Sequence, residues 1–153
     1  MEEVLNIAVL GAGLMGHGIA QVFAEFGHSV VVSDPDRDAL ANVSKRIEAN
    51  LRNIGRASEP VLANITVAAQ VADAVRSADV VIEAAPERLE LKRKIFSEAA
   101  ASAPSHAILA SNTSVIPITQ IGEDLPTAAR ARLVGTHWWN PPYLVPQIGR
   151  AHV

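Results

Sequence analysis

The sequence feature that most constrains the fold is the stretch from residue 6 to residue 34, NIAVLGAGLMGHGIAQVFAEFGHSVVVSD. It opens with a short apolar run, residues 6–10, which ends at a glycine and is too short for a helix, so it predicts a buried parallel strand. The turn that follows has the spacing G-x-G-x-x-G. A helix over residues 14–26, stopped by Gly27, and a second strand over residues 28–33 complete the unit. This order of strand, glycine turn, helix and strand is typical of a domain that binds a dinucleotide.

Each glycine of the turn has a separate role. Gly11 allows the tight turn, Gly13 lets the backbone approach a pyrophosphate, and Gly16 lets the helix pack close to the first strand. The helix starts at the turn with Leu14 and Met15, so its free backbone N–H groups and its dipole predict an anion site there.

Asp34 follows the second strand, where a carboxylate can accept hydrogen bonds from both hydroxyls of an adenosine ribose. The same carboxylate would repel a 2′-phosphate, and the next residue is Pro35 rather than an arginine that could pair with one. We therefore expect NAD rather than NADP as the cofactor. The alternative is an ordinary strand–helix–strand unit with no ligand, and the strand, the helix and the acidic residue together argue against it.

Length and composition limit the other possibilities. The 153 residues, 49% hydrophobic with a net charge of −3, suffice for one well-buried domain, which we place over residues 1–146. Lys and Arg total 13 against 16 Asp and Glu, so nothing predicts a nucleic acid partner. The absence of cysteine excludes disulfides, thiolate metal sites and a cysteine nucleophile, and we expect no metal. The N-terminus is acidic and its apolar run is too short for a signal peptide or a membrane span, so we expect a cytoplasmic protein that does not bind membranes.

The rest of the chain alternates between helical and strand patterns. Helices are expected over residues 36–53, 71–76 and 89–101, with a short helical turn within 114–121 and a loop over 55–60. Strands are expected over residues 65–68, 79–83, 108–111 and 133–137. This alternation predicts an α/β fold with a doubly wound, mostly parallel sheet.

Ligands of such sheets bind beyond the carboxyl ends of the strands, and polar residues follow several of the predicted strands. Glu87 and Lys92 follow the fourth strand, although a capped helix start with a solvated Lys92 explains them as well or better. Asn112 and Ser114 lie in the run SNTS after the fifth strand. An ordinary polar turn is the alternative for this run, but its position beside the nicotinamide end of a bound dinucleotide favours a function.

The segment GTHWWNPP after the sixth strand is the sharpest local feature. A histidine can take a hydroxyl proton while hydride leaves the same carbon, so His137 is a candidate general base. Asn140 offers a donor and an acceptor, and the two prolines after it fix the backbone. Three further histidines are interpreted as structural: His17, His28 and His106.

Taken in order, GAGLMGHGIA, Asp34, VIEAAPERLELK, SNTS and GTHWWNPP resemble the N-terminal domain of the 3-hydroxyacyl-CoA dehydrogenase family, from about residue 5 to residue 146. The resemblance implies a Rossmann-type NAD-binding domain and the NAD-dependent oxidation of an L-3-hydroxyacyl thioester to the 3-ketoacyl thioester, or the reverse. Matched by position, it implies the following roles: adenosine ribose binding by Asp34; a cofactor site lined by Ala84, Glu87 and Lys92; Asn112 and Ser114 near the nicotinamide and the substrate hydroxyl; and His137 as the general base with Asn140 beside it.

The chain departs from that family in two respects. The family has a glutamate twelve residues after the histidine, where this chain has Gly149, and it has a further all-helical domain that closes over the substrate and forms a homodimer. One hypothesis covers both: the terminal IGRAHV is what a common sequencing adapter encodes in one frame, so the chain is a fragment and residues 147–153 are a non-native tail. The alternative is a naturally short protein with an unusual tail. We expect the chain to bind NADH but to turn over acetoacetyl-CoA negligibly.

Two other functions stay open. The phosphates of coenzyme A need basic partners, and the region around Arg52 and Arg56 has no lysine-rich hairpin, so a free hydroxy acid such as a sugar acid or a carnitine-like compound is an alternative substrate. The tryptophans after His137 and the Pro-Tyr pair that follows also depart from the commonest acyl-CoA version. The third possibility is a non-catalytic NAD-binding module.

Overall fold

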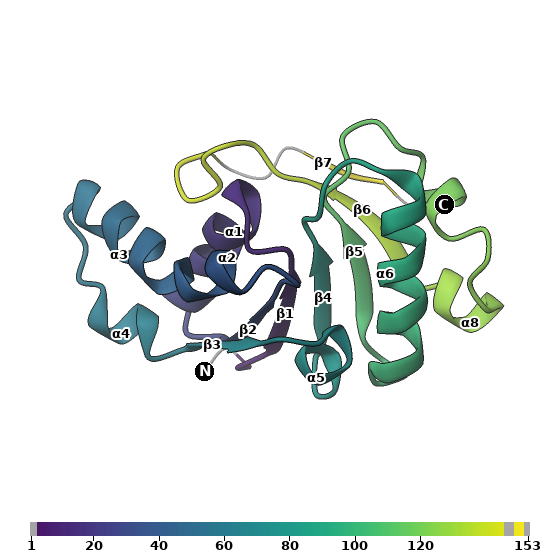
Figure 1. Ribbon diagram of the computed structural model, residues 1–153, viewed down its shortest axis with the longest axis horizontal. Coiled ribbons are helices and arrows are strands. Elements are labelled where there is room, and N and C mark those ends of the chain that lie inside the picture. Colours follow the sequence, from purple (N-terminus) through teal and green to yellow (C-terminus); the bar gives the residue numbers. More distant parts are fainter. Residues whose placement is uncertain (1–2, 146–148, 152–153) are drawn as a thin grey trace.

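In the computed structural model, which describes residues 3–145 and 149–151, a seven-stranded sheet has the order β3-β2-β1-β4-β5-β6-β7 (Figure 1). The strands β1 to β6 run parallel, and β7 pairs antiparallel with β6. The direction of winding changes between β1 and β4, as in a doubly wound sheet. The strands are β1 (Asn6–Leu10), β2 (Ser29–Ser33), β3 (Ile65–Ala68), β4 (Val80–Glu83), β5 (Ile108–Ser111), β6 (Leu133–His137) and β7 (Gly149–Ala151). The predicted α/β fold is confirmed.

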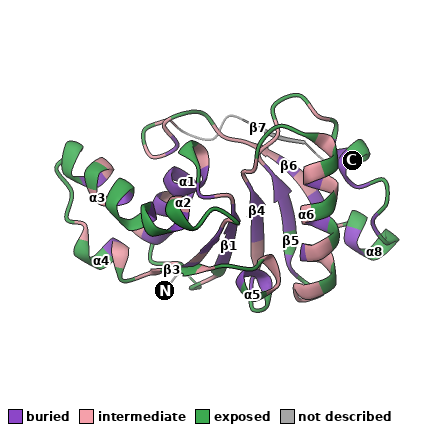
Figure 2. Cartoon of the chain, viewed as in Figure 1, coloured by how far each residue is buried: buried purple, intermediate pink, exposed green. Residues whose placement is uncertain are grey.

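Helices cover both faces of the sheet, so its central strands are buried (Figure 2). Alternate residues of β1 enter two separate cores, because successive side chains of a strand point to opposite faces. Ile7 and Val9 pack with α1 and α3, whereas Ala8 and Leu10 pack with α5 and α6. The helices are α1 (Leu14–Glu25), α2 (Arg37–Ala41), α3 (Val43–Asn53), α4 (Glu59–Leu62), α5 (Val71–Val75), α6 (Leu89–Ser102), α7 (Ile118–Ile121) and α8 (Thr127–Arg130).

The structure differs from the sequence predictions at three short segments. The single helix expected over residues 36–53 is divided at Asn42, whose side-chain amide donates to the Asp38 carbonyl at 2.8 Å and competes with the helical backbone for it. The loop expected over residues 55–60 instead runs into α4, with Pro60 in its first turn, where the missing N–H costs nothing. The short helix α8 was not predicted.

A segment that we call the strap, residues 138–145, follows β6 and passes over α1 (Figure 1). The ring of Pro142 lies so close to Gly18 that a Cβ there would be 2.9 Å from Pro142 Cδ. The ring of Trp138 contacts that of Phe23 edge to face at 6.0 Å between centroids. The hydroxyl of Tyr143 donates to Asn50 Oδ1 on α3 at 3.2 Å. These contacts hold the strap against α1 and α3.

Of residues 147–153, predicted to be non-native, only 149–151 lie within the described residues. Their backbone pairs with β6 from Gly135 to His137. An exposed strand edge accepts main-chain pairing from a segment of almost any sequence, so the origin of these residues stays a prediction.

Within the described parts of the chain, no helix combines the length and the apolar character needed to cross a bilayer.

Candidate cofactor and catalytic site

The glycine turn is packed on one side and open on the other. Gly11 has a φ of +115°, a conformation that strongly favours glycine, and a Cβ there would lie 2.6 Å from the Ala84 carbonyl oxygen. A Cβ on Gly16 would lie 1.7 Å from the Gly11 oxygen. A Cβ on Gly13 would meet no atom within 4 Å. The turn is therefore tightly packed between β1, β4 and α1, and its open face is at Gly13.

The N-terminus of α1 has no side chain that satisfies its backbone N–H groups. Its N-cap residue is Gly13, and its first turn, which begins with Leu14 and Met15, contains no acidic residue. The first N–H groups of a helix need partners, and an anion is the natural one. This open and uncapped helix start fits the pyrophosphate of a dinucleotide.

Asp34 is tied to the glycine turn. Its Oδ2 accepts the Ala12 N–H at 2.8 Å, and its Oδ1 accepts the Asp36 N–H at 2.8 Å. Each carboxylate oxygen has two lone pairs, so one remains on each oxygen for the hydroxyls of a ribose. The carboxylate is thus fixed at the edge of the turn, where the adenosine half of NAD would lie.

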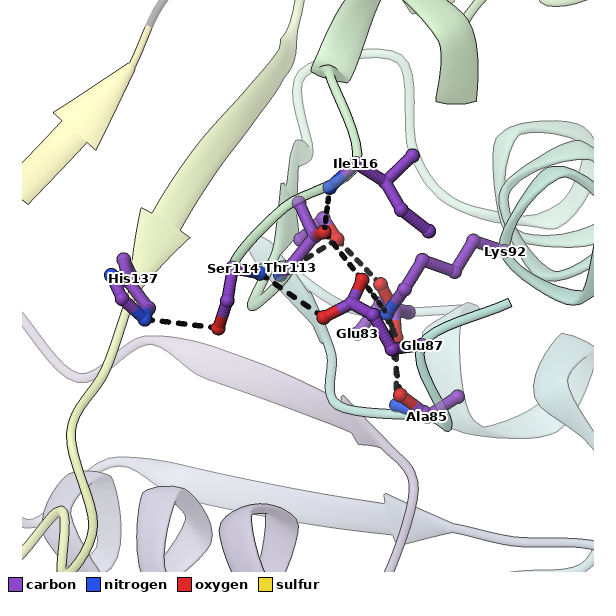
Figure 3. A network of polar contacts seen from close by, with 9 residues as sticks. Glu83, Ala85, Glu87, Lys92, Thr113, Ser114, Ile116 and His137 are labelled. Atoms are coloured by element: carbon purple, nitrogen blue, oxygen red, sulfur yellow. Dashed lines mark hydrogen bonds and ion pairs between the residues drawn. The ribbon is translucent and has the colours of Figure 1, made fainter. Parts of the chain in front are cut away.

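A buried ion pair between Glu83 and Lys92 lies beneath the loop that joins β4 to α6 (Figure 3). Glu83, at the end of β4, is 0% exposed, and Lys92 of α6 is 1% exposed, with 2.7 Å between Oε1 and Nζ. The Ala85 N–H at 2.7 Å and the Ser111 hydroxyl at 2.5 Å donate to the same carboxylate, and Nζ also donates to the Ala85 carbonyl at 3.2 Å. The alternative of a solvated Lys92 is therefore wrong. A buried ion pair needs such additional hydrogen bonds to offset its loss of hydration.

Sequence reasoning placed Glu83 and Ser111 among the polar residues at the ends of the fourth and fifth strands but assigned neither of them a role of its own. The signal was present, because Glu83 is the last residue of a buried apolar strand and a carboxylate in that position needs a buried donor.

Glu87 connects this ion pair to the loop after β5 (Figure 3). Its Oε1 accepts the Thr113 hydroxyl at 2.5 Å and lies 3.7 Å from Lys92 Nζ, and its Oε2 accepts the Ser114 N–H at 3.1 Å. Burial raises the pKa of Glu87, but the hydrogen bonds from Thr113 and Ser114 and the charge of Lys92 outweigh burial and leave that pKa below its ordinary value. Glu87 is therefore a carboxylate at neutral pH that holds Ser114 in place.

His137 ends β6, and its Nε2 lies 3.0 Å from Ser114 Oγ (Figure 3). On the other side of the histidine, the side chain of Asn112 accepts the Trp138 N–H at 2.9 Å. Asn112 therefore fixes the backbone directly after His137. Asn140 lies exposed on the strap, three residues further on. The structure thus gathers Glu87, Ser114 and His137 at the carboxyl edge of the sheet.

The three other histidines interpreted as structural have partners of their own. His17 donates from Nδ1 to the Gly13 carbonyl at 2.7 Å, and burial lowers its pKa. His28 accepts the Leu5 N–H at 3.3 Å, and His106 pairs with Asp79 at 3.1 Å. Asp79 and Leu5 precede β4 and β1, so these two histidines lie at the opposite edge of the sheet.

A parallel, doubly wound sheet with a glycine turn open to an anion and a carboxylate after β2 defines an NAD-binding domain of the Rossmann type. The profile of the 3-hydroxyacyl-CoA dehydrogenase NAD-binding domain matches residues 6–148. The chain belongs to the 3-hydroxyacyl-CoA dehydrogenase family.

Individual relatives agree with this placement. The human mitochondrial hydroxyacyl-coenzyme A dehydrogenase is 38% identical over 150 residues, which are 90% of this chain and 47% of that protein. The L-carnitine dehydrogenase of Nocardiopsis dassonvillei is 38% identical over 152 residues, which are 96% of this chain and 45% of that protein. The crystal structure of 3-hydroxybutyryl-CoA dehydrogenase from Escherichia coli K12 has a TM-score of 0.85 and 35% identity, over 94% of this chain and 31% of that one. This chain therefore spans about half the length of the two relatives.

Proposed function

We propose that this domain serves the NAD-dependent oxidation of L-3-hydroxyacyl-CoA to 3-ketoacyl-CoA, or the reverse. The observation that carries the proposal is the contact between His137 Nε2 and Ser114 Oγ, at the sheet edge where the glycine turn opens. A general base and a hydroxyl donor beside a nicotinamide are what the removal of a proton and a hydride from one carbinol requires.

The side chains would have the following roles in the reaction. A substrate hydroxyl that lies within reach of both His137 and Ser114 would donate to Nε2 and accept from Oγ, so the imidazole would take the proton as the carbonyl forms. Glu87 keeps the Ser114 backbone in position, and Asn112 does the same for the backbone after His137. Asn140 supplies a further polar group beside the base. NAD would supply the hydride acceptor when bound, and Gly13, Asp34 and the loop from Ala84 to Glu87 are the parts of the chain that would hold it.

We propose that the whole protein has the two family features that this chain lacks. The family's orienting glutamate would stand at the position of Gly149, and its helical domain would close over the substrate and form a homodimer. We propose a cytoplasmic protein with a small-molecule substrate and neither a nucleic acid nor a membrane as partner. The 153-residue chain would bind NADH and would turn over acetoacetyl-CoA negligibly.

The test uses the full-length gene and the variants His137→Gln and His106→Gln. Loss of a general base lowers kcat by about 10²- to 10⁴-fold, so His137→Gln should lose that much activity towards acetoacetyl-CoA with an unchanged Kd for NADH. His106 lies at the opposite edge of the sheet, and its variant is the matched control. Equal activity of the two variants would exclude His137 as the base. A full-length protein that binds NADH but oxidises no hydroxy compound would be the non-catalytic NAD-binding module.

A second candidate is a dehydrogenase of a free 3-hydroxy acid, either carnitine-like or a sugar acid. Two observations favour it. L-carnitine dehydrogenases are 35–38% identical to this chain, as similar as the acyl-CoA enzymes. Arg52 of α3 and Arg56 of the turn after it are also already paired, with Glu48 and Glu25, which leaves these two arginines less available to the phosphates of coenzyme A. Comparing kcat/KM for 3-hydroxybutyryl-CoA, L-carnitine and sugar acids in the full-length protein separates the two.

A further inference from the structure

Helix α3 presents one arginine to the glycine turn. Arg46 Nη1 donates to the Ala12 carbonyl at 3.2 Å, across 34 residues of sequence. The N–H of the same residue donates to Asp34, so Ala12 is hydrogen-bonded through both its carbonyl and its N–H. Among residues 3–145, Arg46 takes part in no ion pair, whereas Arg52 on the same helix is paired with Glu48 at 3.0 Å. Arg46 thus brings an uncompensated positive charge to the turn.

An open cavity of about 460 Å³ lies between the start of α1 and the middle of α3. Its wall contains the first residues of α1 on one side and Arg46 on the other. The six lining residues are Gly13, Leu14, His17, Arg46, Ala49 and Asn50. The backbone groups that receive the pyrophosphate and the guanidinium of Arg46 therefore face the same space.

Arg46 is the charged group of this cavity. Burial and, to a smaller extent, the charge of Arg46 lower the pKa of His17, although the Gly13 carbonyl acts in the opposite direction. His17 is therefore neutral at pH 7, and the other four lining residues carry no charge. A negative group at Gly13 would meet N–H donors on one side and the guanidinium on the other.

We propose that Arg46 is a cofactor-binding residue that interacts with the pyrophosphate of the dinucleotide. The guanidinium shares a cavity with Gly13 and Leu14, the start of α1, where the pyrophosphate would lie. Charge-assisted hydrogen bonds to a planar guanidinium suit phosphate oxygens. The proposal depends on NAD being the ligand of the turn, as the proposed function has it.

The test measures the Kd of the 153-residue chain for NADH and for ADP-ribose by fluorescence and calorimetry. The variants are Arg46→Gln, Arg46→Lys and Arg52→Gln. Arg46→Gln keeps a donor for the Ala12 carbonyl but loses the charge, and Arg52→Gln removes the same charge from the same helix. We expect Arg46→Gln to raise both Kd values about five- to tenfold at low salt, with a weaker dependence on salt, and Arg46→Lys to recover most of the affinity. Arg52→Gln should remain within about twofold of the wild type, because its charge is exposed and paired.

Different outcomes overturn different claims. If the wild type binds NADH and the two glutamine variants bind it equally, the role of Arg46 is wrong and the cofactor assignment stands. If the wild type binds neither NADH nor ADP-ribose, both claims are wrong. An effect of Arg46→Gln on NADPH but not on NADH would place the guanidinium at a 2′-phosphate and overturn the pyrophosphate assignment. Unchanged thermal unfolding of Arg46→Gln shows that the loss comes from binding.

Discussion

Replacing Lys92 with methionine tests whether the buried ion pair holds the loop that carries Glu87. Methionine is flexible and apolar, so it should fill most of the volume of the lysine stem. The substitution leaves the Glu83 carboxylate at 0% exposure with only the Ala85 N–H and the Ser111 hydroxyl as donors. The Glu83 carboxylate would then be a buried charge without its counter-ion, which destabilises the folded protein.

The expected loss follows from that burial. Removing one partner of a buried ion pair costs about 3–5 kcal/mol of unfolding free energy. The unfolding free energy of a domain of this size is roughly 5–15 kcal/mol, so Lys92→Met should remove a large part of it. The midpoint of thermal unfolding should fall by about 6–20 °C. The double variant Glu83→Gln/Lys92→Met removes both charges and keeps an acceptor for Ala85 and Ser111, so it should recover all but about 1–2 kcal/mol.

The assay is urea unfolding followed by circular dichroism and by tryptophan fluorescence, with NADH binding measured alongside. The single variant should also bind NADH more weakly, because Glu87 and the loop around it lose their support. A loss below about 1 kcal/mol for Lys92→Met, or a double variant less stable than the single one, would refute the reasoning.

Four further substitutions test the site. Gly16→Ala should lower the unfolding free energy by about 3 kcal/mol or more, because its Cβ would lie 1.7 Å from the Gly11 oxygen. Gly13→Ala has room for its Cβ, so this variant should fold normally but bind NADH more weakly. Similar stabilities of the two variants would contradict the packing of the turn. Asp34→Asn should weaken NADH binding about five- to tenfold and reduce the preference for NADH over NADPH, and an unaltered preference would exclude Asp34 as the ribose ligand. The pKa of Glu87 is lower in the folded protein than its ordinary 4.5, so its contribution to stability is present above pH 4.5 and is lost as the pH falls through the folded value. Glu87→Gln should therefore be less stable than the wild type at neutral pH, and the difference should close in acid. A difference in stability that does not change with pH would count against this account.

The sequence predicts the sheet well because a strand buried on both faces is a short and continuous apolar run. The predicted ranges of β1, β3, β5 and β6 agree with the structure, and those of β2 and β4 start one residue early. The break at Asn42 was not predicted because a polar side chain competes with the backbone there, while the apolar period continues through it. Hydrophobic periodicity reports which face is buried and carries little information about caps.

The site divides in the same way. Gly11, Asp34 and His137 could be proposed as site residues from the sequence because each stands at the end of a strand or directly after one. The burial of Lys92 and the approach of Arg46 to Ala12 could not, because both depend on where one helix lies against another part of the chain. A charged residue on an amphipathic helix is usually solvated, and only the three-dimensional packing shows the exceptions.

The contact between Gly18 and Pro142 has a consequence for catalysis. Helix α1 begins at the pyrophosphate site, and its second turn supports the strap that follows the proposed base. The position of His137 relative to the start of α1 is therefore set by packing within one folding unit. The proposed base loses its orientational entropy relative to the cofactor site when the domain folds, and only the cofactor and the substrate would lose theirs on binding. A second domain that closes over this edge would need to orient only the substrate.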